Sequence, residues 1–77
     1  MDINSFIDNF GAQFDDLGGV ELKPDTKFRD IPDWSSLVGL SVIAMVDEEY
    51  DVQLRGDDVR SSNTIQELYD KVVAKKA

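Results

Sequence analysis

Cysteine and histidine are both absent from this chain of 77 residues. Without cysteine there can be no disulfide, no zinc–thiolate site and no thiol nucleophile. Without histidine the chain lacks the most common general base and the most common metal ligand. The acidic residues do not follow the Asp-x-Asp-x-Asp-Gly spacing of a calcium loop, so no metal site is expected. We therefore expect a chain that catalyses no reaction by itself.

Long apolar runs and an excess of positive charge are also missing. No run reaches the roughly 18 apolar residues that a membrane-spanning helix needs, so no membrane span is expected. Residues 1–4 are acidic rather than basic, unlike a signal peptide, and a cytoplasmic location is expected. The net charge of −8 argues against nucleic acid as a partner, because its phosphates would repel the surface. The same charge favours partners with basic patches.

The length and the hydrophobic fraction of 42% predict one small domain over residues 1–77 with a thin core. Apolar residues recur at spacings of three and four over residues 3–14, which predicts an amphipathic helix that Asp2 or Asn4 can cap. The glycine pair at 18–19 is expected to mark its end or the turn just after it. Residues 15–34 then form a long connection, and loops of this length are often functional.

The apolar run over residues 37–46 predicts a second helix. It should begin at Ser35 or Ser36 and continue to about Tyr50. The helix is apolar on most sides and the domain is small. Part of the helix surface is therefore expected to meet a partner or a ligand.

Two further helices follow in the last third of the chain. Residues 56–60 predict a short helix, and Thr64 with Glu67 forms a capping box that begins the last one. The chain is thus predicted to be all-α: a small four-helix bundle of three longer helices and one short helix, with a long loop between the first and second. A core this small could also open to take an apolar ligand. The inward-facing positions are expected to be Phe6, Phe10, Phe28, Leu37, Leu40, Ile43, Val46, Ile65, Leu68 and Val72.

Four segments, in order and at the right spacing, resemble the acyl carrier protein family. Residues 24–31 read Pro-Asp-Thr-Lys-Phe-Arg-Asp-Ile, similar to the family's loop before its modified serine. Residues 35–37 read Ser-Ser-Leu where the family has Asp-Ser-Leu. Residues 47–52 are similar to the acidic end of the family's second helix, and residues 64–68 match its Thr-Ile-x-x-Leu.

The resemblance implies that a phosphopantetheinyl transferase attaches 4′-phosphopantetheine to Ser36. The chain would then be a non-catalytic carrier. It would hold acyl intermediates as thioesters on that arm and deliver them to enzymes of fatty acid, polyketide or related lipid biosynthesis. The start of a helix suits a phosphate, because its N–H groups are unpaired and its dipole is positive there. The alternative is that Ser35 and Ser36 only cap the helix. In that case the chain is an acidic, carrier-like interaction module with Ser36 unmodified.

The chain departs from the family pattern on the expected partner surface. Ser35 replaces an acid that takes part in recognition, and Asp33 is a candidate substitute. We expect a monomer whose partners, acyl-transferring and condensing enzymes, dock through basic or apolar patches. Two alternatives stay open: Val38 can pack against the core instead, and Trp34 can either anchor the loop or cover the arm. The predicted partner-binding residues are Ser35, Leu37, Val38, Ser41, Ala44, Asp47 and Glu48.

Overall fold

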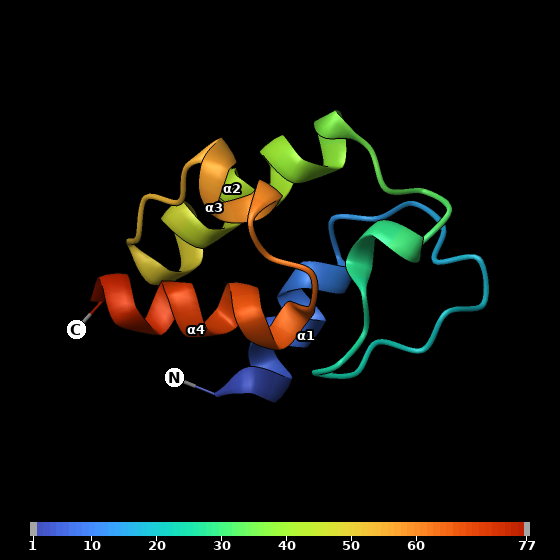
Figure 1. Cartoon of the computed structure of the whole chain (residues 1–77), viewed down its shortest axis with the longest axis horizontal. Coiled ribbons are helices and arrows are strands. Elements are labelled where there is room, and N and C mark those ends of the chain that lie inside the picture. The colour runs from blue at the N-terminus through green and yellow to red at the C-terminus, as the bar shows by residue number, and fades with distance from the viewer. Residues whose placement is uncertain (1, 77) are drawn as a thin grey trace.

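A computed structural model describes residues 2–76 (Figure 1). All named secondary-structure elements in this part of the chain are helices. It contains no named strand within those residues, only an isolated antiparallel bridge between Lys27 and Thr64. The predicted all-α bundle of three longer helices and one short helix is confirmed. The elements are α1 (Ile3–Gly11), the 3₁₀ turn η1 (Phe28–Asp30), α2 (Ser36–Tyr50), α3 (Gly56–Arg60) and α4 (Ile65–Lys76).

The first helix begins where the sequence predicts. The Asp2 side chain accepts a hydrogen bond from the N–H of Asn4 at 3.2 Å. The prediction of its end was wrong, because α1 stops at Gly11, well before the glycine pair at 18–19. A Cβ on residue 11 would lie 2.8 Å from the Leu22 side chain, so the loop packs directly against the last turn of α1.

After α1 the chain turns rather than continuing as a helix. The N–H of Phe14 bonds the carbonyl of Gly11 at 3.1 Å, which brings Phe14 into the core. The next two N–H groups, of Asp15 and Asp16, donate to the Asp33 carboxylate at 3.0 and 3.4 Å. The N–H groups of Gln13 and Phe14 each bond a carbonyl three residues back, so the α-helix has ended before Asp15, and the Asp33 carboxylate holds the turn that follows.

The second helix has the predicted bounds. The Ser35 hydroxyl accepts a hydrogen bond from the N–H of Val38, and so serves as its N-cap. At the other end Asp51 adopts a left-handed conformation (φ 56°) and its N–H bonds the carbonyl of Asp47 at 3.0 Å. This is a common way to end a helix, because it satisfies a carbonyl that the last turn leaves unpaired.

The last two helices are capped by carboxylates. The Asp58 side chain of α3 accepts from the N–H of Arg55 at 2.8 Å. At the start of α4 the N–H of Glu67 donates to the Thr64 hydroxyl, and the Thr64 N–H donates to the Glu67 carboxylate, both at 3.1 Å. The predicted capping box is therefore present.

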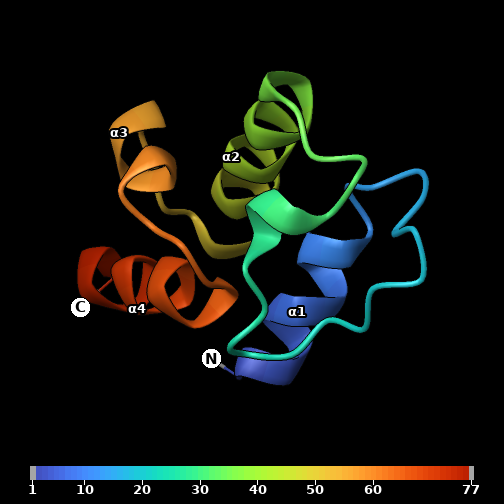
Figure 2. The same ribbon diagram turned by 45° about the vertical axis from the view of Figure 1, so that its right-hand side comes forward.

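The helices contact one another in a ring, with α1 and α3 each packed against both α2 and α4 (Figure 2). The connection between α1 and α2 covers one side of the molecule in both views, held by the buried Phe28 and Ile31. No helix within residues 2–76 has the length and apolar character to cross a membrane.

Two of the predicted core positions are wrong. Leu37 is 76% exposed and Leu40 is 61% exposed, whereas the buried face of α2 carries Val42, Met45 and Val46. Positions 42, 45 and 46 lie on one side of a helix, and positions 37 and 40 fall on the opposite side. The sequence did not choose between these faces because α2 is apolar on both. The other predicted core positions are buried, except Ile43, which is half-buried against the core.

Candidate functional site

The two serines at the start of α2 have different surroundings. Ser35 is held by its cap hydrogen bond to Val38. Ser36 is the first residue of α2, is exposed, and has no hydrogen bond to its hydroxyl within residues 2–76. The Ser36 hydroxyl is therefore accessible to an external reagent. Within residues 2–76 no side chain is hydrogen-bonded to this hydroxyl in a position to activate it.

The backbone at this helix start is arranged to face a negative group. Neither the Ser36 N–H nor the Leu37 N–H has an acceptor in the described part of the chain. Such unpaired donors, together with the positive end of the helix dipole, favour a phosphate near the first turn. The first turn of α2 therefore offers two backbone donors beside the Ser36 hydroxyl, and the residues on either side of Ser36 are uncharged.

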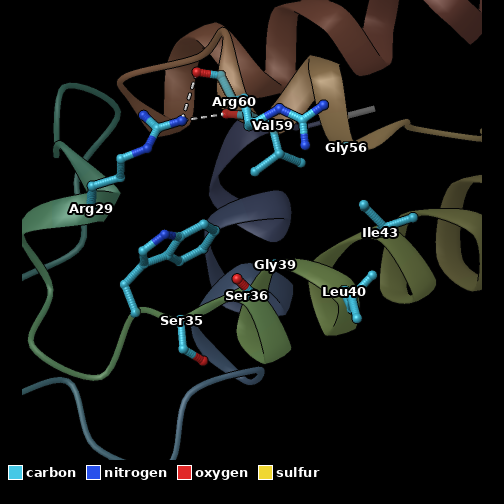
Figure 3. A pocket seen from close by; sticks show the side chains of 10 residues that line it. Arg29, Ser35, Ser36, Gly39, Leu40, Ile43, Gly56, Val59 and Arg60 are labelled. Carbon is cyan, nitrogen blue, oxygen red and sulfur yellow. Dashed lines mark hydrogen bonds between the residues drawn. The ribbon is translucent and has the colours of Figure 1, made fainter.

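A pocket of about 300 Å³ lies beside Ser36, between α2 and α3 (Figure 3). Figure 3 shows the Ser36 hydroxyl directed into it and the Ser35 side chain directed away. The pocket is lined by Arg29, Trp34, Ser35, Ser36, Gly39, Leu40, Ile43, Gly56, Val59 and Arg60.

A second pocket, of about 340 Å³, continues along the same side of α2. It shares Leu40 and Ile43 with the first pocket, and Arg55 is among its other lining residues. We call the two together the α2–α3 groove. The sequence suggested instead that the core would open to take an apolar ligand. The space next to Ser36 lies on the surface, and only Leu40 and Ile43 of the predicted core residues line it.

Trp34 anchors the loop, which is one of the two roles that the sequence left open. It is half-buried, and its ring lies 4.8 Å from the Phe28 ring and 6.2 Å from the Phe14 ring, measured between centroids. It therefore anchors the loop to the core. Its outer edge lines the pocket beside Ser36 and lies over Gly39, where an added Cβ would be 3.6 Å away.

Arg29 is a site residue that the sequence did not reveal. Its guanidinium donates to the carbonyls of Ser62, Arg60 and Val59, at 2.6, 2.7 and 2.8 Å, and thereby holds the end of α3. It also lies 5.1 Å from the centre of the Phe28 ring. A single arginine in a loop gives no local signal, because its partners are about thirty positions further along the chain.

Most of the predicted partner-binding residues lie on one exposed stripe of α2, which we call the α2 stripe. Its members are Leu37, Ser41, Ala44, Asp47 and Glu48. Ser35 is exposed at its beginning. Val38 is half-buried and packs against the core, as in the alternative that the sequence left open.

Asp33 does not belong to the α2 stripe. Its Oδ2 is held by the N–H groups of Asp15 and Asp16. Among the described residues, no group of three or more acidic side chains is placed to hold a metal ion.

Comparison with known proteins identifies the family. The acyl carrier proteins of Chlorobium phaeobacteroides and Chlorobium phaeovibrioides are each 33% identical over 55 residues, covering 71% of this chain and 70% of theirs. The solution structure of a holo acyl carrier protein from Geobacter metallireducens superposes with a TM-score of 0.76 over 95% of this chain and 83% of that one, at 23% identity. No family model matches the chain. The identity and coverage of the Chlorobium relatives show that the chain belongs to the acyl carrier protein family, whose members are non-catalytic carriers.

Proposed function

We propose that Ser36 carries 4′-phosphopantetheine and that the chain transports acyl intermediates as thioesters on this arm. The observation that supports the proposal is the free Ser36 hydroxyl at the first residue of α2, directed into a pocket. The arm supplies the thiol to which an acyl group is joined. The chain itself supplies the attachment point, the helix start and the groove.

The attachment needs little from this chain. The Ser36 oxygen forms a bond to the phosphorus that carries pantetheine, and the pyrophosphate bond of coenzyme A breaks. Adenosine 3′,5′-bisphosphate leaves, and the hydroxyl proton goes to a base on the transferase. Ser35 keeps the first turn of α2 in place through Val38. The unpaired N–H groups of Ser36 and Leu37 then face the new phosphodiester.

The proposed partners are a phosphopantetheinyl transferase and enzymes that transfer or condense acyl groups, acting in the cytoplasm. The α2 stripe supports this choice, because Leu37 and Ala44 expose apolar surface while Asp47 and Glu48 add negative charge at its far end. We propose docking patches that are apolar near Ser36 and basic further along. These partners would be more specialised than those of general fatty acid synthesis.

Mass spectrometry tests the attachment. The purified chain is incubated with coenzyme A and several transferases, including that of its own host. We expect a mass gain of one 4′-phosphopantetheine group on the wild type and on Ser35→Ala, and none on Ser36→Ala. A mass gain that persists in Ser36→Ala would move the attachment elsewhere and contradict the proposal.

Ser35 suggests a second candidate function, because the acyl carrier protein pattern has an acidic residue at this position. Under it the chain is an acidic interaction module and Ser36 is never modified. If no transferase adds mass to the wild type while carrier enzymes still bind it, this second function is the correct one.

The docking proposal is tested with one added acid. Ala44→Glu places a carboxylate in the middle of the α2 stripe, and Ala74→Glu adds the same charge at an exposed position of α4. We expect only Ala44→Glu to strengthen binding to a ketosynthase with a basic patch. Wild-type binding that already equals that of an acid-faced carrier would contradict specialised partners.

A further inference from the structure

The arginines of this acidic chain gather along the α2–α3 groove. The chain has a net charge of −8, and its arginines are Arg29, Arg55 and Arg60. Arg29 and Arg60 line the pocket beside Ser36, and Arg55 lines the pocket that continues from it. No carboxylate lines the first pocket, and only Asp47 lines the second. The groove is therefore a positively charged site in a negatively charged protein.

These charges are largely uncompensated by the protein. Arg29 donates to neutral carbonyls, and no carboxylate pairs with it in residues 2–76. The same holds for the Arg55 side chain in that part of the structure. Arg60 pairs with Asp57, but the two side chains are 73% and 84% exposed. Exposed pairs of this kind are weak, so the Arg60 guanidinium remains available to a second anion.

The rest of the lining is apolar. Trp34, Leu40, Ile43 and Val59 supply most of the wall of the first pocket, and Figure 3 shows Arg29 and Arg60 on the side opposite Ser36. An apolar pocket with a few charged groups orients an amphipathic occupant rather than a plain hydrocarbon chain. Arginine is also the side chain best suited to carboxylate and phosphate, because its planar guanidinium can bond both oxygens of such a group.

The hydrogen bonds from Arg29 to carbonyls at the end of α3 explain the position of Arg29, but they do not explain the positions of Arg55 and Arg60. The Arg60 side chain takes no part in those hydrogen bonds, since only its backbone carbonyl accepts from Arg29, and its guanidinium lies beside Gly56, 3.2 Å from where a Cβ there would be. We propose that the α2–α3 groove receives an anionic group carried on the Ser36 arm, which the Arg60 guanidinium binds while the charge of Arg29 attracts it from the same wall of the pocket. This inference rests on the proposed function. The anion is either the phosphodiester of the arm or a carboxylate on the cargo.

Charged and neutral cargoes of equal length distinguish these sources. Holo protein is loaded with succinyl or with butyryl groups, which share four carbons and differ in the terminal carboxylate. The melting temperature is measured for the apo, holo and loaded forms of the wild type, Arg60→Gln and Lys23→Gln. Lys23→Gln is the matched control, because it removes one positive charge from the loop, away from the groove.

If the cargo carboxylate is the anion, the succinyl form melts about 4 °C above the butyryl form, a shift expected for one good charged contact in a domain of this size. This difference persists in Lys23→Gln, is lost in Arg60→Gln and shrinks at high salt. If the phosphodiester is the anion, the rise from apo to holo depends on Arg60 and the carboxylate adds nothing further.

Equal effects of Arg60→Gln and Lys23→Gln on every form would overturn the inference. Arg55→Gln removes one charge from the second pocket and is expected to behave as Lys23→Gln does, so a loss confined to Arg60→Gln locates the anion in the first pocket. Because loading is first checked by mass, failure to attach the arm at all is seen before melting. That result contradicts the proposed function and is distinct from the failure of the anion site.

Discussion

The Ser35 hydroxyl accepts a hydrogen bond from the N–H of Val38 at 3.3 Å, whereas its neighbour Ser36 makes none within the described residues. Of the two adjacent serines, Ser35 therefore caps the helix, and the Ser36 hydroxyl contributes no hydrogen bond to it. Ser35→Ala should lower the free energy of unfolding by about 1 kcal/mol, the usual cost of losing an N-cap. Ser36→Ala should change it by less than about 0.5 kcal/mol. Urea unfolding followed by circular dichroism measures both, and equal losses would contradict this difference between the two serines.

Arg29 is expected to be the side chain that most strongly secures α3. Arg29→Ala removes hydrogen bonds to the carbonyls of Val59, Arg60 and Ser62, and we expect a loss of about 2 kcal/mol in unfolding free energy. Hydrogen exchange over residues 56–62 should accelerate in the same variant. Arg60→Ala is the control, because its exposed pair with Asp57 should contribute less than about 0.5 kcal/mol.

If Arg29→Ala and Arg60→Ala lowered stability by the same amount, the bracing role of Arg29 would be wrong. Arg29→Lys adds a finer comparison. Its single ammonium keeps the charge but cannot reproduce the spread of the guanidinium over three carbonyls. We expect its stability to lie between those of the wild type and Arg29→Ala.

Gly39 and Gly19 should respond to alanine in opposite directions. At Gly39, within α2, an added Cβ would make ordinary contact with Trp34, so Gly39→Ala should stabilise the chain by about 1 kcal/mol through helix propensity. Gly19 has open space around it, but its φ is +79°. Gly19→Ala should therefore destabilise by about 1 kcal/mol. Thermal melting of the two variants measures both effects. A higher melting temperature for Gly19→Ala would contradict the argument from its positive φ.

Asp58 should make the free energy of unfolding fall as the solution becomes acidic. The hydrogen bond from the Arg55 N–H is the main cause that lowers the pKa of the Asp58 carboxyl below 3.8; burial opposes it, and Lys75 and Lys71 reinforce it. The contribution of Asp58 is therefore fully present above the unfolded-state pKa and is lost as pH falls through the folded-state pKa. Asp58→Asn should be less stable than the wild type at neutral pH.

The difference between the wild type and Asp58→Asn should shrink as pH falls and vanish below the folded-state pKa. Urea unfolding at a series of pH values measures it. Asp25→Asn, at an exposed position in the loop, reports the general effect of removing one negative charge from a chain of net charge −8. A constant difference between the wild type and Asp58→Asn at all pH values would show that the carboxylate is not the cause.

Helix starts were predictable because their signals are local. Asp2, Ser35 and Thr64 each bond an N–H within three residues. The end of α1 was not predictable from periodicity, since the apolar spacing continues to Phe14 although the helix ends at Gly11. Periodicity also could not choose the buried face of α2, because Leu37 and Leu40 on one side are as apolar as Val42 and Val46 on the other.

The site was predictable only in part, because some of it depends on contacts between residues that are far apart in the sequence. Ser36 lies in a short motif at a helix start, and the structure places its hydroxyl on the surface. The groove beside it is formed when α3 is brought against α2, with Arg29 binding carbonyls of residues 59–62. Contacts across that distance in the chain leave no pattern in the sequence, so neither the groove nor its charge could be foreseen.

Trp34 is the chain's single tryptophan, and it stands in the wall of the pocket beside Ser36. Indole emission is sensitive to the polarity of its immediate surroundings. The protein therefore contains its own fluorescent reporter, in the place where a tethered group would arrive. Loading and unloading can be followed in real time by intrinsic fluorescence, without attaching a dye that would itself compete for the groove.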